Sequence, residues 1–314
     1  MTRISLAFAA SAAVLVALLP PTPAQALFRT YVSRGGSDAN NCDLPTPCLT
    51  MGRAVQQTTS GGIASCLDSN DYTQTVTIDK SMTVDCASVP GTSAAGPFII
   101  NTPGVKVTIK NVVIFVNGSP GISFTDGASL VVENCFIRNN PVGISFAPTA
   151  VGAKLVVTDT LIKDNTGAGI LVQASTGGLA FATIQRVTVT GNGGAGITGN
   201  GNNGGGAHIS VRDSLSTFNL HGYTAATNAA GVVMKIGRSE AALNTQYGVL
   251  ANGPTAVAIG YSTIMGNTTG LASFGGGQIL SYGNNINVDN GTNGAPTGGS
   301  PPAVRPTGAR GGLA

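Results

Sequence analysis

Residues 131–144 read Val-Val-Glu-Asn-Cys-Phe-Ile-Arg-Asn-Asn-Pro-Val-Gly-Ile, and residues 156–170 read Val-Val-Thr-Asp-Thr-Leu-Ile-Lys-Asp-Asn-Thr-Gly-Ala-Gly-Ile. Each stretch has an apolar run, a polar residue, a second short apolar run, an asparagine, and a glycine followed by isoleucine. Self-similarity at a regular period is typical of solenoid proteins, because one repeat cannot bury its apolar side alone.

The same pattern recurs from about Val105 onward in seven repeats spaced 22 to 27 residues apart. Three columns define it: the asparagines Asn117, Asn140, Asn165, Asn192, Asn219, Asn244 and Asn267; the glycines Gly121, Gly143, Gly169, Gly196, Gly222, Gly248 and Gly270; and the mostly apolar residues Ile114, Ile137, Ile162, Val189, Ser216, Ala241 and Ile264. We expect the asparagines and glycines at turns, because both tolerate positive φ. Stacked asparagine side chains can also bond to one another.

These repeats predict an all-β fold, a single-stranded right-handed parallel β-helix with a short N-terminal capping helix. Left-handed hexapeptide helices need a six-residue rhythm, which is not visible. Calcium-binding nonapeptide rolls need an aspartate in each glycine-rich turn, and residues 199–206 have none. Leucine-rich repeats need several leucines per unit, whereas these units use Val, Ile and Thr.

The domain boundaries follow from the ends of the repeats. Residues 27–294 form the β-helix, with an N-terminal cap at residues 27–74. Thr50 is expected to cap a helix whose apolar face carries Met51, Ala54 and Val55. Residues 75–86 are expected to supply the first strands, and Asn290 with Gly294 a last partial turn. Residues 295–314, rich in Pro and Gly, are expected to be a disordered tail.

The N-terminus reads as a signal peptide. Arg3 is followed by an apolar stretch from Ile4 to Leu19, and Ala24-Gln25-Ala26 is an A-x-A cleavage site. We expect cleavage after Ala26, a secreted or periplasmic mature protein, and no membrane span once the leader is removed.

Charge is sparse, at 9% of residues, and the formal net charge is +3. Without Arg3 the count is 15 basic against 13 acidic residues, or +2. The basic residues do not cluster with aromatics, so a nucleic-acid partner is not expected. No Asp-x-Asp cluster offers convergent oxygen ligands, so neither calcium nor another metal or cofactor is expected.

Five cysteines fit an exported chain. Cys42 and Cys48 enclose a short loop, which favours their pairing and leaves Cys66 with Cys86, although four cysteines allow three pairings. Cys135 occupies a periodic apolar position and is expected to be a buried free thiol.

The stretch Thr30-Tyr31-Val32-Ser33-Arg34-Gly35-Gly36-Ser37-Asp38-Ala39-Asn40 resembles the opening of secreted bacterial right-handed β-helix proteins, as does Pro47-Cys48-Leu49-Thr50-Met51-Gly52-Arg53-Ala54-Val55. With the repeats, the resemblance to the pectin-lyase-like superfamily covers roughly Phe28 to Asn290. That superfamily includes pectate lyases, polygalacturonases, other polysaccharide lyases and phage tailspikes. The resemblance therefore implies a fold and leaves function to be argued from a site.

The resemblance to polygalacturonases implies a catalytic aspartate directly before a repeat glycine, in the pattern Asn-Thr-Asp-Gly. Here that column reads Pro120, Val142, Ala168, Ala195, His221, Tyr247 and Thr269. Glycoside hydrolysis usually needs two carboxylates, so this activity is not expected.

Two candidate sites remain. His221 and Tyr247 share a column in adjacent repeats and should lie ~5 Å apart; they could serve a lyase, or simply pack together. A second column, Asn111, Asn134, Asp159, Arg186, Asp213, Arg238 and Tyr261, alternates charge at its centre. Asp159, Arg186, Asp213 and Arg238 could line a groove for a charged glycan, or form a ladder of surface ion pairs. His208 begins a strand and is expected to be structural.

Two functional hypotheses follow. The first is a non-catalytic β-helix that binds polysaccharide or serves as a surface-interaction module. The second is a lyase acting on an acidic polysaccharide around His221 and Tyr247, in which calcium or Arg and Lys side chains neutralise the uronate and Arg, Lys, His or Tyr transfers the protons.

Overall fold

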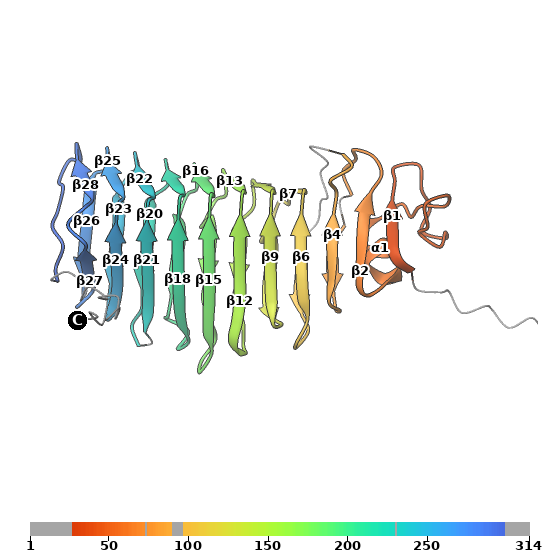
Figure 1. Cartoon of the computed structure of the whole chain (residues 1–314), viewed down its shortest axis with the longest axis horizontal. Coiled ribbons are helices and arrows are strands. Elements are labelled where there is room, and N and C mark those ends of the chain that lie inside the picture. Colours follow the sequence, from red (N-terminus) through yellow and green to blue (C-terminus); the bar gives the residue numbers. More distant parts are fainter. Residues whose placement is uncertain (1–26, 73, 90–96, 230, 299–314) are drawn as a thin grey trace, which may run out of the picture.

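The computed structural model describes residues 27–72, 74–89, 97–229 and 231–298. They form one solenoid in which strands of successive turns lie side by side along a single axis (Figure 1). The predicted leader, residues 1–26, and residues 299–314 lie outside the described residues. Within the described part, no helix is long and apolar enough to cross a membrane.

Three parallel sheets, named A, B and C below, run along the solenoid; sheet A spans its whole length, whereas sheet C begins at Val113. Sheet A contains β1 (Leu27–Val32), β2 (Thr58–Cys66), β4 (Met82–Asp85), β6 (Lys106–Lys110), β9 (Ser129–Glu133), β12 (Val151–Thr158), β15 (Leu179–Gln185), β18 (Gly206–Arg212), β21 (Val232–Gly237), β24 (Thr255–Gly260) and β27 (Gln278–Ser281). Sheet C contains β7 (Val113–Phe115), β10 (Phe136–Arg138), β13 (Leu161–Lys163), β16 (Thr188–Thr190), β19 (Leu215–Thr217), β22 (Glu240–Ala242), β25 (Thr263–Met265) and β28 (Ile286–Val288).

Sheet B contains β3 (Val76–Ile78), β5 (Phe98–Asn101), β8 (Ile122–Asp126), β11 (Ile144–Phe146), β14 (Ile170–Val172), β17 (Ala195–Asn200), β20 (His221–Ala226), β23 (Tyr247–Asn252) and β26 (Thr269–Phe274). Each full turn passes from sheet A through two residues to sheet C, then through an asparagine-containing turn to sheet B. A loop of varying length returns the chain to sheet A.

The core is built from equivalent positions of successive repeats, stacked along the solenoid axis. Ile137 pairs with Ile114 on one side and Ile162 on the other, and all three are buried. The column continues through Val189, Ser216 and Ala241 to Ile264, as the repeat spacing predicts. Because side chains alternate across each strand, the residues on either side of this column face outward.

The capping helix is confirmed. It is α1 (Met51–Gln57), its N-cap is Thr50, and the Thr50 side chain accepts a hydrogen bond from the Arg53 backbone N–H at 3.1 Å. Met51, Ala54 and Val55 are buried against the first turns. The prediction that strands begin at residue 75 was wrong, because β1 and β2 already form two strands of sheet A in front of β4. In β2 the adjacent glycines Gly61 and Gly62 interrupt the apolar–polar alternation that marks later strands.

The positive-φ explanation for the repeat asparagines and glycines was also wrong. Residues with positive φ lie elsewhere, notably at the first residue of the two-residue turn from sheet A to sheet C. The repeat glycines are needed because neighbouring turns approach each other closely at these positions. A Cβ at Gly248 would lie 2.8 Å from the carbonyl oxygen of Gly270 on the next turn.

The repeat asparagines form a buried ladder. The side-chain oxygen of Asn192 accepts bonds from the backbone N–H of Asn165 at 3.1 Å and from its Nδ2 at 2.8 Å. The same pair of hydrogen bonds links Asn140 to Asn165 and Asn192 to Asn219. The ladder ends at Asn290. Asn117 is not part of it: Asn117 is exposed, and the N–H of Val116 donates to Asn140 instead.

The two ends of the solenoid are closed differently. The N-terminal end is covered by α1, whereas the C-terminal turn is rich in asparagine. Asn287 occupies the inward position that Ile264 fills one turn earlier, and its amide donates to the carbonyl of Asn293. Thr297 and Gly298, placed in the tail by sequence, bond to Ile279 of β27. Polar groups therefore close the last turn, as terminal repeats require.

Candidate functional site

The charged column of the sequence lies at the turn from sheet A to sheet C. Each of its seven residues, from Asn111 to Tyr261, has φ between 47° and 59°. A left-handed conformation is unfavourable for Arg or Tyr. It is stabilised here because each backbone N–H bonds to the next turn, as from Asp213 to the carbonyl of Gly237 at 3.2 Å.

The four charged side chains of this column form two closed ion pairs. Arg186 donates from Nε and Nη2 to the two oxygens of Asp159, both at 2.7 Å. Arg238 donates in the same way to Asp213, at 2.7 and 3.0 Å. Hydrogen bonds from these arginines hold the pKa of both aspartates below its usual value. The carboxylates are therefore ionised and occupied, which suits a structural ladder better than a general acid.

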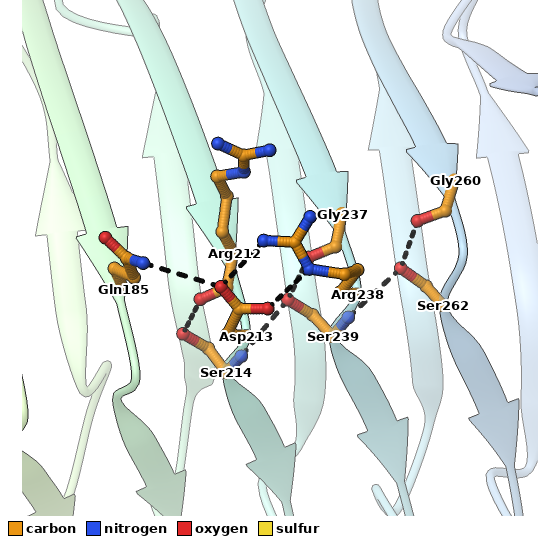
Figure 2. Close-up of polar contacts among 9 residues, drawn as sticks. All are labelled: Gln185, Arg212, Asp213, Ser214, Gly237, Arg238, Ser239, Gly260 and Ser262. Atoms are coloured by element: carbon orange, nitrogen blue, oxygen red, sulfur yellow. Dashed lines mark hydrogen bonds and ion pairs between the residues drawn. The ribbon is translucent and has the colours of Figure 1, made fainter.

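A ladder of hydroxyl groups supports the turn from inside (Figure 2). Ser214 donates to the carbonyl of Arg212 at 2.7 Å and accepts from the N–H of Val187 at 3.2 Å. Ser239 and Ser262 repeat this arrangement on the next two turns. Buried polar groups of the turn are satisfied in this way, so the register of neighbouring turns is fixed.

The outer face of sheet A carries a second charged feature, which the sequence analysis missed. Lys154, Arg212 and Lys235 lie at exposed, outward positions of β12, β18 and β21. The six strands of sheet A from β12 to its last strand, β27, contain no aspartate or glutamate. Within the described ranges, none of these three cations forms an ion pair. This part of sheet A is therefore a face of one sign, and we call it the cationic face.

Two adjoining grooves lie on this face. The first, of about 520 Å³, is lined by Arg212, Lys235, Arg238, Tyr261 and Tyr282, together with small residues such as Gly237 and Gly260. The second, of about 310 Å³, is lined by Phe181 and His208, and it shares Ser210 and Lys235 with the first. Tyr261 and Tyr282 are 73% and 50% exposed. Cations beside open aromatic rings are groups that can hold an acidic sugar.

Other grooves follow the turn column itself. One of about 760 Å³ is lined by Arg186, Asp213, Arg238 and Glu240 and includes Tyr261. Another, of about 470 Å³, covers the N-terminal half, where amides such as Asn111 and Asn134 face Val113 and Phe136. The arginines of the first of these grooves are paired with aspartates, and Glu240 adds a negative charge there, so the cationic face is the stronger site for an anionic ligand.

His208 is exposed, contrary to the expectation that it is structural. It follows Ala207, whose side chain enters the core, and therefore points to solvent. Its ring lies 5.4 Å from that of Phe181, with the two planes at 89°.

His221 and Tyr247 are brought together on sheet B. Their rings stack with centroids 5.0 Å apart and planes at 25°. Burial lowers the pKa of His221, and its Nδ1 has no hydrogen-bond partner within the described structure. The neighbouring strands β17, β20, β23 and β26 contain no Lys or Arg. A cation to neutralise a uronate is therefore lacking on these strands.

The column before the repeat glycines contains no carboxylate. The structure pairs Ala195 with His221, His221 with Tyr247, and Tyr247 with Thr269. The position that the polygalacturonase pattern requires is thus correctly aligned and not acidic. Among residues 27–72, 74–89, 97–229 and 231–298, no three His, Cys, Asp or Glu side chains are placed to hold a metal ion.

Two disulfides join Cys42 to Cys48 and Cys66 to Cys86, the pairing favoured by the sequence. Cys135 is a buried free thiol, and burial raises its pKa to about 12. Its thiol donates to the carbonyl of Glu133, as the serine hydroxyls do on later turns. The Cys135 thiol therefore takes the place, on its own turn, that the serine hydroxyls take in the ladder of later turns.

Comparison with protein-family models agrees with this architecture. The family described as "Right handed beta helix region" matches residues 60–214. Curated proteins gave no match. One similar structure is the catalytic domain of an alpha-1,3-glucanase in complex with tetrasaccharides, at 10% identity and TM-score 0.37, covering 85% of this chain and 58% of that chain. Another is a rhamnogalacturonan lyase, at 10% identity and TM-score 0.30, covering 85% and 88%.

This chain thus spans less than two thirds of the glucanase domain. The family match and the three parallel sheets define a right-handed parallel β-helix, which confirms the predicted fold class.

Proposed function

We propose that the protein binds an acidic polysaccharide on the cationic face of sheet A and does not cleave it. The observation that carries the proposal is the charge distribution: Lys154, Arg212 and Lys235 share a face whose strands contain no carboxylate. Each unpaired cation attracts an anionic sugar, and no residue of the same strands competes for it. The two disulfides support the further proposal that the chain is exported, since disulfides persist in oxidising compartments.

The absence of catalysis is proposed on the geometry of the candidate acids and bases. Asp159 and Asp213 are held by arginines, and the column aligned with His221 has no carboxylate. A polysaccharide lyase is the second candidate, because His221 and Tyr247 do lie side by side. That reading requires a cation near them, which strands β17 to β26 of sheet B do not supply.

The test is a panel of acidic and neutral polysaccharides mixed with the mature protein. Binding is measured by affinity electrophoresis, and cleavage by ultraviolet absorbance of unsaturated ends and by new reducing ends. We expect retarded migration in acidic polysaccharides alone, with no cleavage signal. An absorbance signal that His221→Ala or Tyr247→Phe abolishes would establish the lyase instead. Equal retardation by single-stranded DNA would identify a general polyanion binder.

A further inference from the structure

The groove of about 310 Å³ on the cationic face is aromatic, unlike the adjoining groove that Arg212 and Tyr282 line. Its walls are the rings of Phe181 and His208, set at right angles 5.4 Å apart. Phe181 is 38% exposed although it is a large apolar side chain. An exposed aromatic ring in a groove is available to stack against the apolar face of a sugar ring.

The order of residues along the axis is informative. In the register of sheet A, Lys154 pairs with Phe181, and Phe181 pairs with His208. The next strand, β21, carries Lys235, which lies opposite Ser210. A cation, an aromatic pair and a second cation therefore follow one another across four adjacent strands. Lys235 lines both grooves and joins the aromatic one to the cationic one.

We propose that Phe181 and His208 form a stacking subsite, and that the ligand of this face is a polysaccharide in which an acidic sugar alternates with a less polar one. This inference rests on the proposed function, since it assigns the units of the same ligand. The acidic units contact Lys154 on one side and Lys235 with Arg212 on the other. The less polar unit lies between them, on Phe181. A polymer of acidic units alone would place a charged, hydrated group against that ring.

Two hexasaccharides of equal length test the assignment. One is an oligogalacturonate, in which every unit is acidic; the other is a hyaluronan fragment, in which uronate alternates with N-acetylglucosamine. The galacturonate carries twice the charge, so electrostatic attraction alone would make it bind more tightly. The stacking subsite predicts the opposite order. We expect the wild-type protein to bind the alternating hexamer about tenfold more tightly, as one stacking contact would give.

Phe181→Ala should remove this preference and leave the affinity for oligogalacturonate within about twofold of wild type. The matched control is Phe115→Ala, since Phe115 is 39% exposed and lies on sheet C; it should change neither affinity. Thermal unfolding of both variants checks that each is folded. A wild-type preference for oligogalacturonate, or an unchanged preference in Phe181→Ala, would overturn the inference while the binding function stands. Failure of both hexamers to bind would instead refute the proposed function.

Discussion

Arg238 and Asp213 occupy the same position on consecutive turns, and the guanidinium of Arg238 holds both carboxylate oxygens of Asp213, at 2.7 and 3.0 Å. A bidentate pair of this kind fixes the relative position of two turns. It also removes Asp213 from the set of groups that could act as a catalytic acid. The charged column, which by sequence could be either a groove or a ladder, is thus a ladder whose charges satisfy one another.

The ion pairs predict how stability depends on pH. Because the folded pKa of Asp159 and Asp213 is lowered, their contribution is present above the unfolded value of about 4. It is lost as the pH falls through the lower folded value. The double variant D159N/D213N should unfold at a slightly lower temperature than wild type at pH 7, with the gap closing in strong acid. Thermal scans at several pH values measure this, and a gap that widens in acid would contradict it. The pairs are exposed, so added salt should narrow the gap.

Removing one asparagine from the buried ladder should lower the free energy of unfolding. Asn192→Ala leaves the buried N–H and side-chain amide of Asn165 without their acceptor. Each buried unsatisfied donor costs about 1–3 kcal/mol, so we expect the free energy of unfolding to fall by roughly 3 kcal/mol. Denaturant titration measures it. Asn117→Ala is the control, because Asn117 is exposed and outside the ladder. Equal losses in the two variants would refute the ladder's role.

The repeat glycines should be intolerant of a methyl group for a steric reason. Ala at position 248 would press its Cβ against Gly270 and the side chains of Ile264 and Asn267. Such overpacking typically costs about 1–3 kcal/mol. Gly237→Ala, where the nearest atom is 4.0 Å away, should be nearly neutral. Chemical denaturation of both variants decides the matter, and a neutral Gly248→Ala would show that the turns separate more easily than the structure indicates.

Cys135 should be unreactive in the folded protein. A thiol with a pKa of about 12 is almost entirely protonated at pH 8, and it is also buried. We expect no labelling by a thiol reagent in buffer and one label per chain in denaturant without reductant. Cys135→Ser should fold normally, because serine fills the same position on later turns. Rapid labelling of the native protein would contradict this account.

The sequence predicted the repeats because their cause is local. A buried Ile137 needs buried partners one turn away, and the pattern therefore recurs visibly along the chain. The wrong assignment of Asn117 has an equally local reason. Its spacing to Gly121 matches the pattern, but the turn is built differently, and Val116 takes the ladder bond.

The cationic face could not be seen in the same way. Lys154, Arg212 and Lys235 are far apart in sequence and differ in their position within the repeat. Only the register of β12, β15, β18 and β21 shows that they share one face. For the same reason His208 looked structural: its outward direction depends on Ala207 being inside.

The binding claim is tested most directly by the affinity for polygalacturonate of wild type and of the double variant R212E/K235E, measured by isothermal titration calorimetry at low ionic strength. Lys163→Glu is the control, because Lys163 lies on sheet C beside Asp164. The structure predicts binding by wild type and by the control, and at least a tenfold loss in R212E/K235E. Binding unchanged by the double reversal, in a protein that is still folded, would contradict the account.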